Sequence, residues 1–321
     1  MKGFNFYFGS DCNKKIFIEE KLLQYFSERK FQRIEVPSVH YYDFEANPAI
    51  NVNSTIRAMD TDGSMIMLCP DISYLVCQYI NGLKNIERPI RVAHKGRDFL
   101  LVADESGDRE RTKIGADIIG DDSAEAEAEM IIMAIESMRT LGIRDFKVEL
   151  SHVDYLGGIL KMCNFSPSDY GKVTSAIEKN DRFTLQLIQA KYNLSDQILR
   201  AFEKTDDLCG EGDGVLTAGK KNAINETSLN AIERLIKVYE ILTEKGYRKY
   251  LLFDLSLSAN PDYYSGIVFK LLTKYSNAPL VGGGRCDNLT RCDEGDTQVG
   301  FSININELLR TYNAMGIKVK G

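Results

Sequence analysis

The feature of this sequence that most restricts its fold is a pair of long strand-like segments separated by a short polar turn. RPIRVAHKGRDFLLV (88–102) and RERTKIGADIIG (109–120) flank the turn ADESGD. Two runs of this kind around a polar loop are typical of a β-hairpin. The pair therefore predicts two long antiparallel strands, and it favours an antiparallel sheet over a parallel α/β sheet.

Helices and shorter strands surround this hairpin in the sequence. Residues 14–29 carry apolar side chains on one helical stripe, and the next segment, FQRIEVP, alternates as a strand that stops at Pro37. TDG at 61–63 predicts the turn of a second hairpin, and DISYLVCQYI after it predicts a helix. SAEAEAEMIIMAIESMRTLG predicts a long helix capped by Asp122 and Glu125. Further strands return near the C-terminal end, so the order of elements predicts the α+β class.

A mostly helical stretch, residues 154–246, interrupts this pattern. The chain has seven prolines and no Pro-, Ser- or Gly-rich linker. A second domain would therefore be an insertion in the core rather than a separate module. We expect a core formed by residues 1–163 and 247–321, with a helical lobe at 164–246.

Composition and charge exclude several classes of function. With 44% hydrophobic residues the chain can bury a sizeable core, so it is not a disordered or fibrous protein. Forty Lys and Arg against 46 Asp and Glu give a net charge of −6, which argues against nucleic acid as the main ligand. We find no long apolar run and no secretion signal, so we expect a cytoplasmic protein without membrane contact.

Cysteine and histidine are too scattered to suggest a metal site or a disulfide framework. The seven cysteines include no C-x-x-C pair, and there are three histidines. We therefore expect reduced thiols and no bound metal. His94 and His152 lie in strand-like segments without a partner nucleophile, so both are interpreted as structural.

Four further motifs have both a structural and a functional interpretation. CGEGDG (209–214) lacks the strand and the lysine of a phosphate loop, so we expect a flexible loop there and no cofactor. The glycines of VGGGRCDNL (281–289) indicate either a tight turn or close approach to a ligand. The acidic run AEAEAEM is expected to be a solvated helix N-terminus, and the tyrosines of DYYSG are expected in the core or in a pocket.

The order of these segments resembles the catalytic core of histidyl-tRNA synthetase, a class II synthetase. It resembles more closely the non-synthetase relative of that enzyme, the ATP phosphoribosyltransferase regulatory subunit. RIEVP is similar to the first class II motif, which builds a dimer interface, the long hairpin to the second, and VGFSININELL to the third. LCPD, FDLSLSANPDYYSGIVF and PLVGGGRCDNL resemble the segments around the histidine pocket, and GADIIGDDSAEAEAEMI is the most specific match. The resemblance implies an antiparallel class II synthetase-like sheet with flanking helices.

Three positions depart from the synthetase pattern. The arginines with which the synthetases hold ATP correspond here to Leu100, Ala259 and Glu307. Each such charge-assisted donor contributes roughly 3 kcal/mol to a phosphoryl transition state, so their loss implies that the chain forms no adenylate. The short stretch after the third motif and the negative charge lead us to expect no anticodon-binding domain and no tRNA ligand.

The amino-acid end of the pocket is kept. By resemblance, Asp71 would meet a ligand ammonium, Asp117 would meet an imidazole, and Tyr264 would lie beside that ring. Lys113 and Cys286 replace a glutamine and a tyrosine of the family. The complete set expected to bind histidine is Asp71, Ser73, Lys113, Asp117, Tyr263, Tyr264, Gly283 and Cys286.

The resemblance implies a catalytically silent subunit. It would assemble, as a homodimer within a hetero-oligomer, with the short-form ATP phosphoribosyltransferase catalytic subunit. It would activate the first step of histidine biosynthesis and transmit inhibition by L-histidine. Two alternatives stay open: a diverged adenylate-forming enzyme, which the missing arginines disfavour, and a free-standing histidine-binding module.

Overall fold

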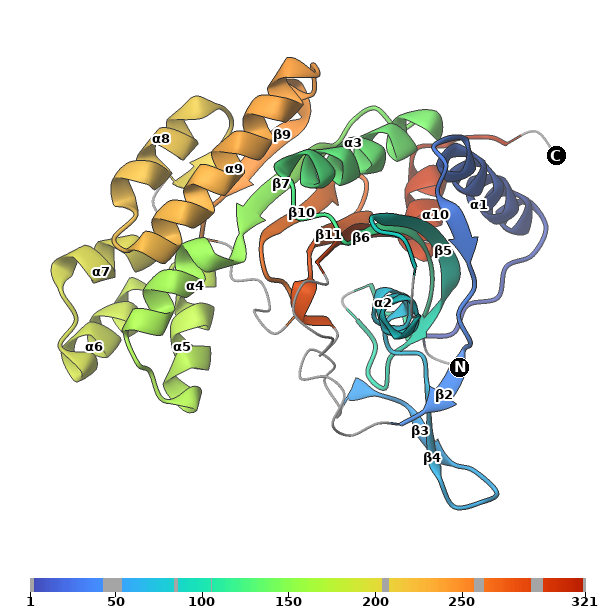
Figure 1. Cartoon of the computed structure of the whole chain (residues 1–321), viewed down its shortest axis with the longest axis horizontal. Helices are drawn as coiled ribbons and strands as arrows, with labels where there is room; N and C mark the ends of the chain where they lie inside the picture. Colours follow the sequence, from blue (N-terminus) through green and yellow to red (C-terminus); the bar gives the residue numbers. More distant parts are fainter. Residues whose placement is uncertain are drawn as a thin grey trace. The chain divides into compact units, whose positions relative to one another are not determined.

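The chain forms two compact units in the computed structural model (Figure 1). One unit comprises Met1–Phe146 and Lys270–Gly321, and the other comprises Lys147–Phe269. The helical lobe expected at 164–246 falls within the second unit. The residues that the structure describes are 3–42, 54–83, 86–104, 106–203, 208–256, 263–289 and 297–319.

The first unit is built on a sheet whose strands follow the order β1-β5-β6-β12-β11-β10. β5 and β6 pair antiparallel along ten residues each, which confirms the long hairpin. β1, the outermost strand, runs parallel to β5. The bounds are β1 (Gln32–Ile34), β5 (Ile90–Phe99), β6 (Glu110–Ile119), β12 (Gln298–Asn304), β11 (Val281–Arg285) and β10 (Ile267–Leu272), which begins in the second unit.

Helices cover both faces of this sheet. α1 (Ser10–Glu28), α3 (Ala124–Thr140) and α10 (Ile305–Ala314) pack on one face, where the rings of Phe26 and Phe301 meet edge-to-face at 5.8 Å. α2 (Ile72–Gly82) lies on the other face (Figure 1). The helices predicted at 14–29, in DISYLVCQYI and in the Glu-rich segment are confirmed. A short 3-10 helix, η4 (Asp287–Leu289), follows β11.

A small second sheet has the strand order β2-β4-β3, formed by β2 (Val39–Tyr41), β4 (Met65–Leu68) and β3 (Arg57–Met59). The predicted hairpin at 61–63 joins β3 to β4, with Gly63 at a φ of 85°. A side-chain-free residue adopts this conformation without strain, which is why the turn carries glycine.

The described residues of the second unit form strands in the order β7-β9-β8, six α-helices and one 3-10 helix. β7 and β9 are parallel, although the helical stretch separates them in sequence. CGEGDG, expected to be a loop, forms β8 and begins α8. The bounds are β7 (Lys147–His152), α4 (Val153–Met162), α5 (Pro167–Glu178), α6 (Arg182–Tyr192), α7 (Asp196–Phe202), β8 (Cys209–Gly210), α8 (Asp213–Asn222), α9 (Glu226–Glu244), η3 (Arg248–Tyr250) and β9 (Leu251–Asp254). No helix within the described ranges is long and apolar enough to cross a bilayer.

The Glu-rich helix differs from expectation at two points. Its N-cap is Ser123, whose hydroxyl accepts a hydrogen bond from the N–H of Ala126 at 3.1 Å, rather than the pair Asp122 and Glu125. Glu127 is not solvated: it is 1% exposed and pairs with the buried guanidinium of Arg285 at 2.6 Å. Helical periodicity turns this glutamate toward β11, so the sheet neutralises it.

The Glu127–Arg285 pair yields a stability prediction. Removing one partner of a buried ion pair leaves an uncompensated charge, so Glu127→Ala should lower the free energy of unfolding by about 3–5 kcal/mol. Urea denaturation measures this loss. Glu125→Ala, an exposed glutamate on the same helix, is the matched control and should change stability by less than about 0.5 kcal/mol. Equal losses in the two variants would contradict the role of the pair.

Candidate functional site

One face of the first-unit sheet collects most of the expected pocket residues. Lys113, Gly115 and Asp117 alternate along β6, so they point to the same face. Gly96 of β5 lies opposite Lys113, and a Cβ added to Gly96 would approach the side chain of Ile72 in α2 to 3.1 Å. Helix α2 therefore covers this face of the sheet. The pairing of β5 with β6 therefore presents this set of side chains to the helix that carries Asp71 at its start.

Asp117 is the centre of a buried polar cluster. Its Oδ1 accepts a hydrogen bond from Nε2 of Gln298 at 2.8 Å, and its Oδ2 lies 3.2 Å from Nε2 of His94. Asp117 is 1% exposed, and the other two side chains are fully buried. Because these residues come from β6, β12 and β5, the cluster joins three strands and holds the carboxylate in one orientation.

Two glycines make room for this cluster. A Cβ on Gly300, opposite Asp117, would lie 2.0 Å from Oδ1 of that carboxylate. A Cβ on Gly115 would lie 2.6 Å from the imidazole of His94. Glycine is therefore needed at both positions because no room is left for a side chain. A larger residue would push aside the buried side chains of Asp117 and His94.

Asp71 and Cys286 belong to the same neighbourhood as Asp117. Asp71 is the N-cap of α2, where its carboxylate accepts a hydrogen bond from the N–H of Tyr74 at 2.9 Å, and Ser73 is buried in the first turn. Burial raises the pKa of the Cys286 thiol well above its ordinary value, and the nearby carboxylates of Asp117 and Asp71 add to the rise. The buried Cys286 thiol thus lies near three carboxylates, those of Asp117, Asp287 and Asp71.

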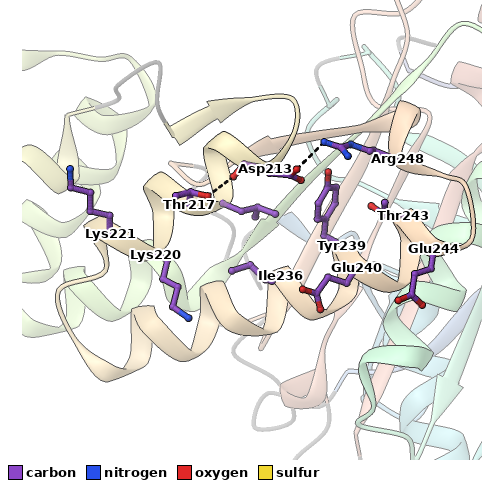
Figure 2. A pocket seen from close by; sticks show the side chains of 11 residues that line it. Asp213, Thr217, Lys220, Lys221, Ile236, Tyr239, Glu240, Thr243, Glu244 and Arg248 are labelled. Carbon is purple, nitrogen blue, oxygen red and sulfur yellow. Dashed lines mark hydrogen bonds and ion pairs between the residues drawn. The ribbon is translucent and has the colours of Figure 1, made fainter.

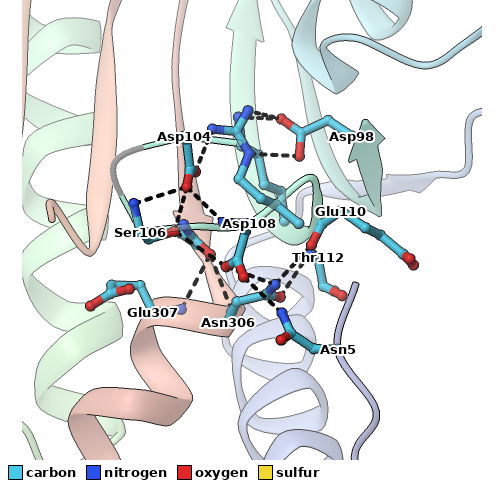
Figure 3. A network of polar contacts seen from close by, with 12 residues as sticks. Asn5, Asp98, Asp104, Ser106, Asp108, Glu110, Thr112, Asn306 and Glu307 are labelled. Carbon is cyan, nitrogen blue, oxygen red and sulfur yellow. Dashed lines mark hydrogen bonds and ion pairs between the residues drawn. The ribbon is translucent and has the colours of Figure 1, made fainter. Parts of the chain in front are cut away.

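Lys113 is bound to an acid rather than free. Its Nζ lies 2.9 Å from Oδ2 of Asp98, a fully buried carboxylate that also accepts hydrogen bonds from Nε and Nη2 of Arg111 (Figure 3). Arg111 reaches Asp104 at 3.2 Å. Burial would raise the pKa of Asp98, but Lys113 and Arg111 outweigh burial and hold it below its ordinary value. The two cations are therefore balanced by two carboxylates.

The same network continues to α10 and the N-terminal segment (Figure 3). Asp108 accepts hydrogen bonds from Arg310 at 2.6 Å, Asn306 at 3.1 Å and Asn5 at 2.7 Å. Glu307 is buried and pairs with Arg310 at 2.6 Å. A cation near this end of the site is thus neutralised by two acids.

The remaining expected residues are more widely distributed. Leu100 follows β5, where its N–H donates to the carbonyl of Arg109 at 2.8 Å. Ala259 lies outside the described residues. Tyr263 and Tyr264 belong to the second unit, where their rings meet edge-to-face with centroids 4.8 Å apart.

Gly283 of β11 belongs to the opposite face of the sheet from Gly282 and Gly284. Gly284 lies opposite Gly300, which itself lies opposite Asp117, so these three residues share a face. Gly283 is displaced by one residue and belongs to the other face. A Cβ on Gly282 would meet no atom within 4 Å. Gly284 therefore aligns with Asp117 across the sheet, and Gly282, on the same face, aligns with Gly115.

Sequence reasoning missed several residues of this face. Asp98 and Gln298 carried no motif, whereas His94, interpreted as structural because it lacks a partner nucleophile, is buried beside Asp117 in agreement with that interpretation. A signal was present: Gly115 and Gly300 are glycines inside strands, where their usual meaning is close approach of another group. What they approach could be seen only after β5, β6 and β12 were placed side by side.

The second unit contains a separate cavity of about 700 Å³ between α8 and α9 (Figure 2). Its wall includes the apolar side chains of Leu216 and Ile236 and the ring of Tyr239. At one end Arg248 pairs with Asp213 at 3.0 Å. None of the residues expected to bind histidine lines this cavity.

The first-unit face carries cations that are paired with acids, and further acids that can accept hydrogen bonds. The described ranges hold no group of three or more His, Cys, Asp and Glu side chains that could bind a metal ion. Arg111, Lys113 and Arg310 are each paired with a carboxylate. The acids Asp71 and Asp117 can accept charge-assisted hydrogen bonds from a cationic or N–H-bearing ligand.

The buried Asp98 cluster yields a pH prediction. Because its pKa is lower in the folded than in the unfolded chain, Asp98 contributes stability above about pH 4 that is lost as the pH falls through its folded pKa. Asp98→Asn should therefore be less stable than wild type at pH 7, and the gap should narrow below about pH 4. Urea unfolding from pH 7 to pH 3 measures both effects. Asp145→Asn, with a side chain 55% exposed, is the control; a constant gap for Asp98→Asn would refute the assignment.

Comparison with known proteins agrees with this architecture. A family model described as histidyl-tRNA synthetase matches residues 3–308. The ATP phosphoribosyltransferase regulatory subunit of Ruminiclostridium cellulolyticum is 30% identical over 312 residues, covering 95% of this chain and 74% of that protein. A solved ATP phosphoribosyltransferase regulatory subunit/histidyl-tRNA synthetase from Bacillus halodurans superposes with a TM-score of 0.85 at 24% identity, covering 96% and 82% of the two chains. A chain of an ATP phosphoribosyltransferase complex from Thermotoga maritima gives 0.69 at 16% identity, covering 91% and 97%. This chain therefore belongs to the histidyl-tRNA synthetase family, among the regulatory subunits of ATP phosphoribosyltransferase.

Proposed function

We propose that this chain is a catalytically silent subunit that assembles with the short-form ATP phosphoribosyltransferase catalytic subunit. It activates the first step of L-histidine biosynthesis and transmits inhibition by L-histidine. It acts as a homodimer within the complex, through the strand at 31–37 and α1, and uses no cofactor and no tRNA. The names of its curated relatives and the complex from Thermotoga maritima support the choice of partner.

The observation that carries catalytic silence is the pairing of the cations on the sheet face. Adenylate formation needs donors that stay free to stabilise charge developing on phosphate oxygens. Leu100 and Glu307 stand at two of the positions where synthetases have such donors. The neighbouring Arg111 and Lys113 are already engaged by Asp98, which is completely buried. If Arg111 or Lys113 turned to bind a phosphate, the buried carboxylate of Asp98 would lose one of its two cationic partners. An uncompensated charge in the interior destabilises the fold.

The carboxylates support histidine as the effector. Asp71 and Asp117 act on the same buried thiol, Cys286, while Lys113 is neutralised by Asp98. The balance of local charge is therefore negative, which favours a ligand that carries an ammonium and an imidazole. Ser73 and the replaced positions Lys113 and Cys286 complete the proposed set in the first unit.

Phosphoribosyl transfer tests the assignment directly. The short-form catalytic subunit should transfer the phosphoribosyl group to ATP faster when this chain is added, because the chain stabilises the active quaternary state. The isolated chain should give no ATP–pyrophosphate exchange with any of the twenty amino acids. Exchange above the enzyme-free blank would establish an adenylate-forming enzyme instead, and an unchanged transferase rate would refute the regulatory role.

Histidine binding provides a second test. If Asp117 accepts a charge-assisted hydrogen bond from the ligand, Asp117→Asn should weaken L-histidine binding by about ten-fold or more. Calorimetry on the complex with the catalytic subunit measures the affinity. Asp62→Asn, in the exposed hairpin turn, is the matched control and should bind as wild type does. Equal affinity in all three proteins would remove Asp117 from the site.

A further inference from the structure

The N-terminal segment exposes two phenylalanine rings to solvent. In residues 4–8, which we call the aromatic arm, Phe6 is 93% and Phe8 is 92% exposed. Phe residues usually bury most of their surface, so two almost fully exposed phenylalanines two positions apart in the sequence are unusual. No other phenylalanine among the described residues is exposed to this degree.

The aromatic arm is attached to the first unit rather than free in solvent. The carbonyl of Gly3 accepts a hydrogen bond from the N–H of Arg109 at 2.7 Å, and the side chain of Asn5 donates to Asp108 at 2.7 Å. The guanidinium of Arg109 lies 5.2 Å from the ring centroid of Phe4. The arm therefore presents its two outer rings from a fixed base, which lowers the entropic cost of burying them in a contact.

Two hollows connect the aromatic arm to the free edge of the sheet. One, of about 560 Å³, is lined by the arm and by α1, and the other, of about 910 Å³, is lined by β1 and β5. Both hollows include Lys15, Glu19, Arg97 and Thr112 in their walls. The arm, α1 and β1 thus form one continuous surface.

The free edge of this surface is complementary to itself. If β1 is extended by one residue and two copies pair antiparallel with Ile34 opposite Ile34, Arg33 of each copy lies opposite Glu35, the residue after β1, of the other. Such opposite-charge pairs across strands are favourable, and a two-fold contact forms each of them twice. β1 also needs cover, since it is the outermost strand of its sheet. The order of charges therefore favours a second copy of this chain over an unrelated partner.

We propose that Phe6 and Phe8 are buried against a second copy of this chain, as the outer part of a contact centred on β1. The proposal rests on the homodimer of the proposed function and assigns it a second element. A standard contact buries about 800 Å² per partner, a patch roughly 30 Å across, so a contact at β1 reaches well beyond the strand itself.

Analytical ultracentrifugation of the full chain tests the proposal. Replacing both rings, Phe6→Ser with Phe8→Ser, should raise the dimer dissociation constant by about 100-fold or more, because two apolar contacts are lost. The melting temperature of the dissociated monomer should stay unchanged, because both rings are exposed in the monomer. Phe183→Ser, on α6 and 70% exposed, is the matched control and should dimerise as wild type does.

The outcomes separate this proposal from the homodimer itself. A wild-type dimer whose affinity the double substitution leaves unchanged would overturn the role of the aromatic arm and leave the homodimer standing. A wild-type monomer at micromolar concentration would overturn both. A double variant that dimerises normally but no longer assembles with the catalytic subunit would assign the arm to that partner and refute the proposal. Arg33→Glu should weaken the dimer, and adding Glu35→Arg should restore it.

Discussion

The antiparallel pairing of β5 with β6 is the constraint on which the rest of the first unit depends. Ten paired residues fix which side chains share a face, since a shift by one residue would turn every side chain to the opposite face. Asp98, Arg111 and Lys113 are brought together by this register, on a face that α2 covers. The strands thus place charges in the interior, and the charges are tolerated because each cation meets a carboxylate.

The same register determines which charged side chains on this face of the sheet neutralise one another. Acidic side chains engage the cations of this face. Asp98 engages Arg111 and Lys113, and Asp108 with Glu307 engages Arg310. Asp71 caps α2, and Asp117 contacts His94 and Gln298. In the function proposed above, a small cationic ligand would bind beside these two acids.

Local patterns were sufficient wherever a structure depends on neighbours in sequence. The long hairpin, the Thr61-Asp62-Gly63 turn and the helices were predicted because periodicity and turn residues act over a few positions. The cap of the Glu-rich helix was assigned one residue away, to Asp122 instead of Ser123, because several adjacent polar residues could serve. CGEGDG was expected to be a loop because its strand, Cys209–Gly210, is too short to show strand periodicity. These two residues form a strand only because they pair with β9.

The sequence by itself determined the α+β class, the long hairpin and the family resemblance, because these depend on the order of elements along the chain. Only the tertiary structure decided the contents of the site. Asp117 and Gln298 are 181 positions apart, yet they are hydrogen-bonded because β6 and β12 are neighbours in the sheet. Lys113 could be interpreted as a cation that enters the pocket until Asp98 was found beside it. Whether a charged side chain is free or neutralised depends on distant residues that folding brings within 3–4 Å, and no local pattern records those contacts.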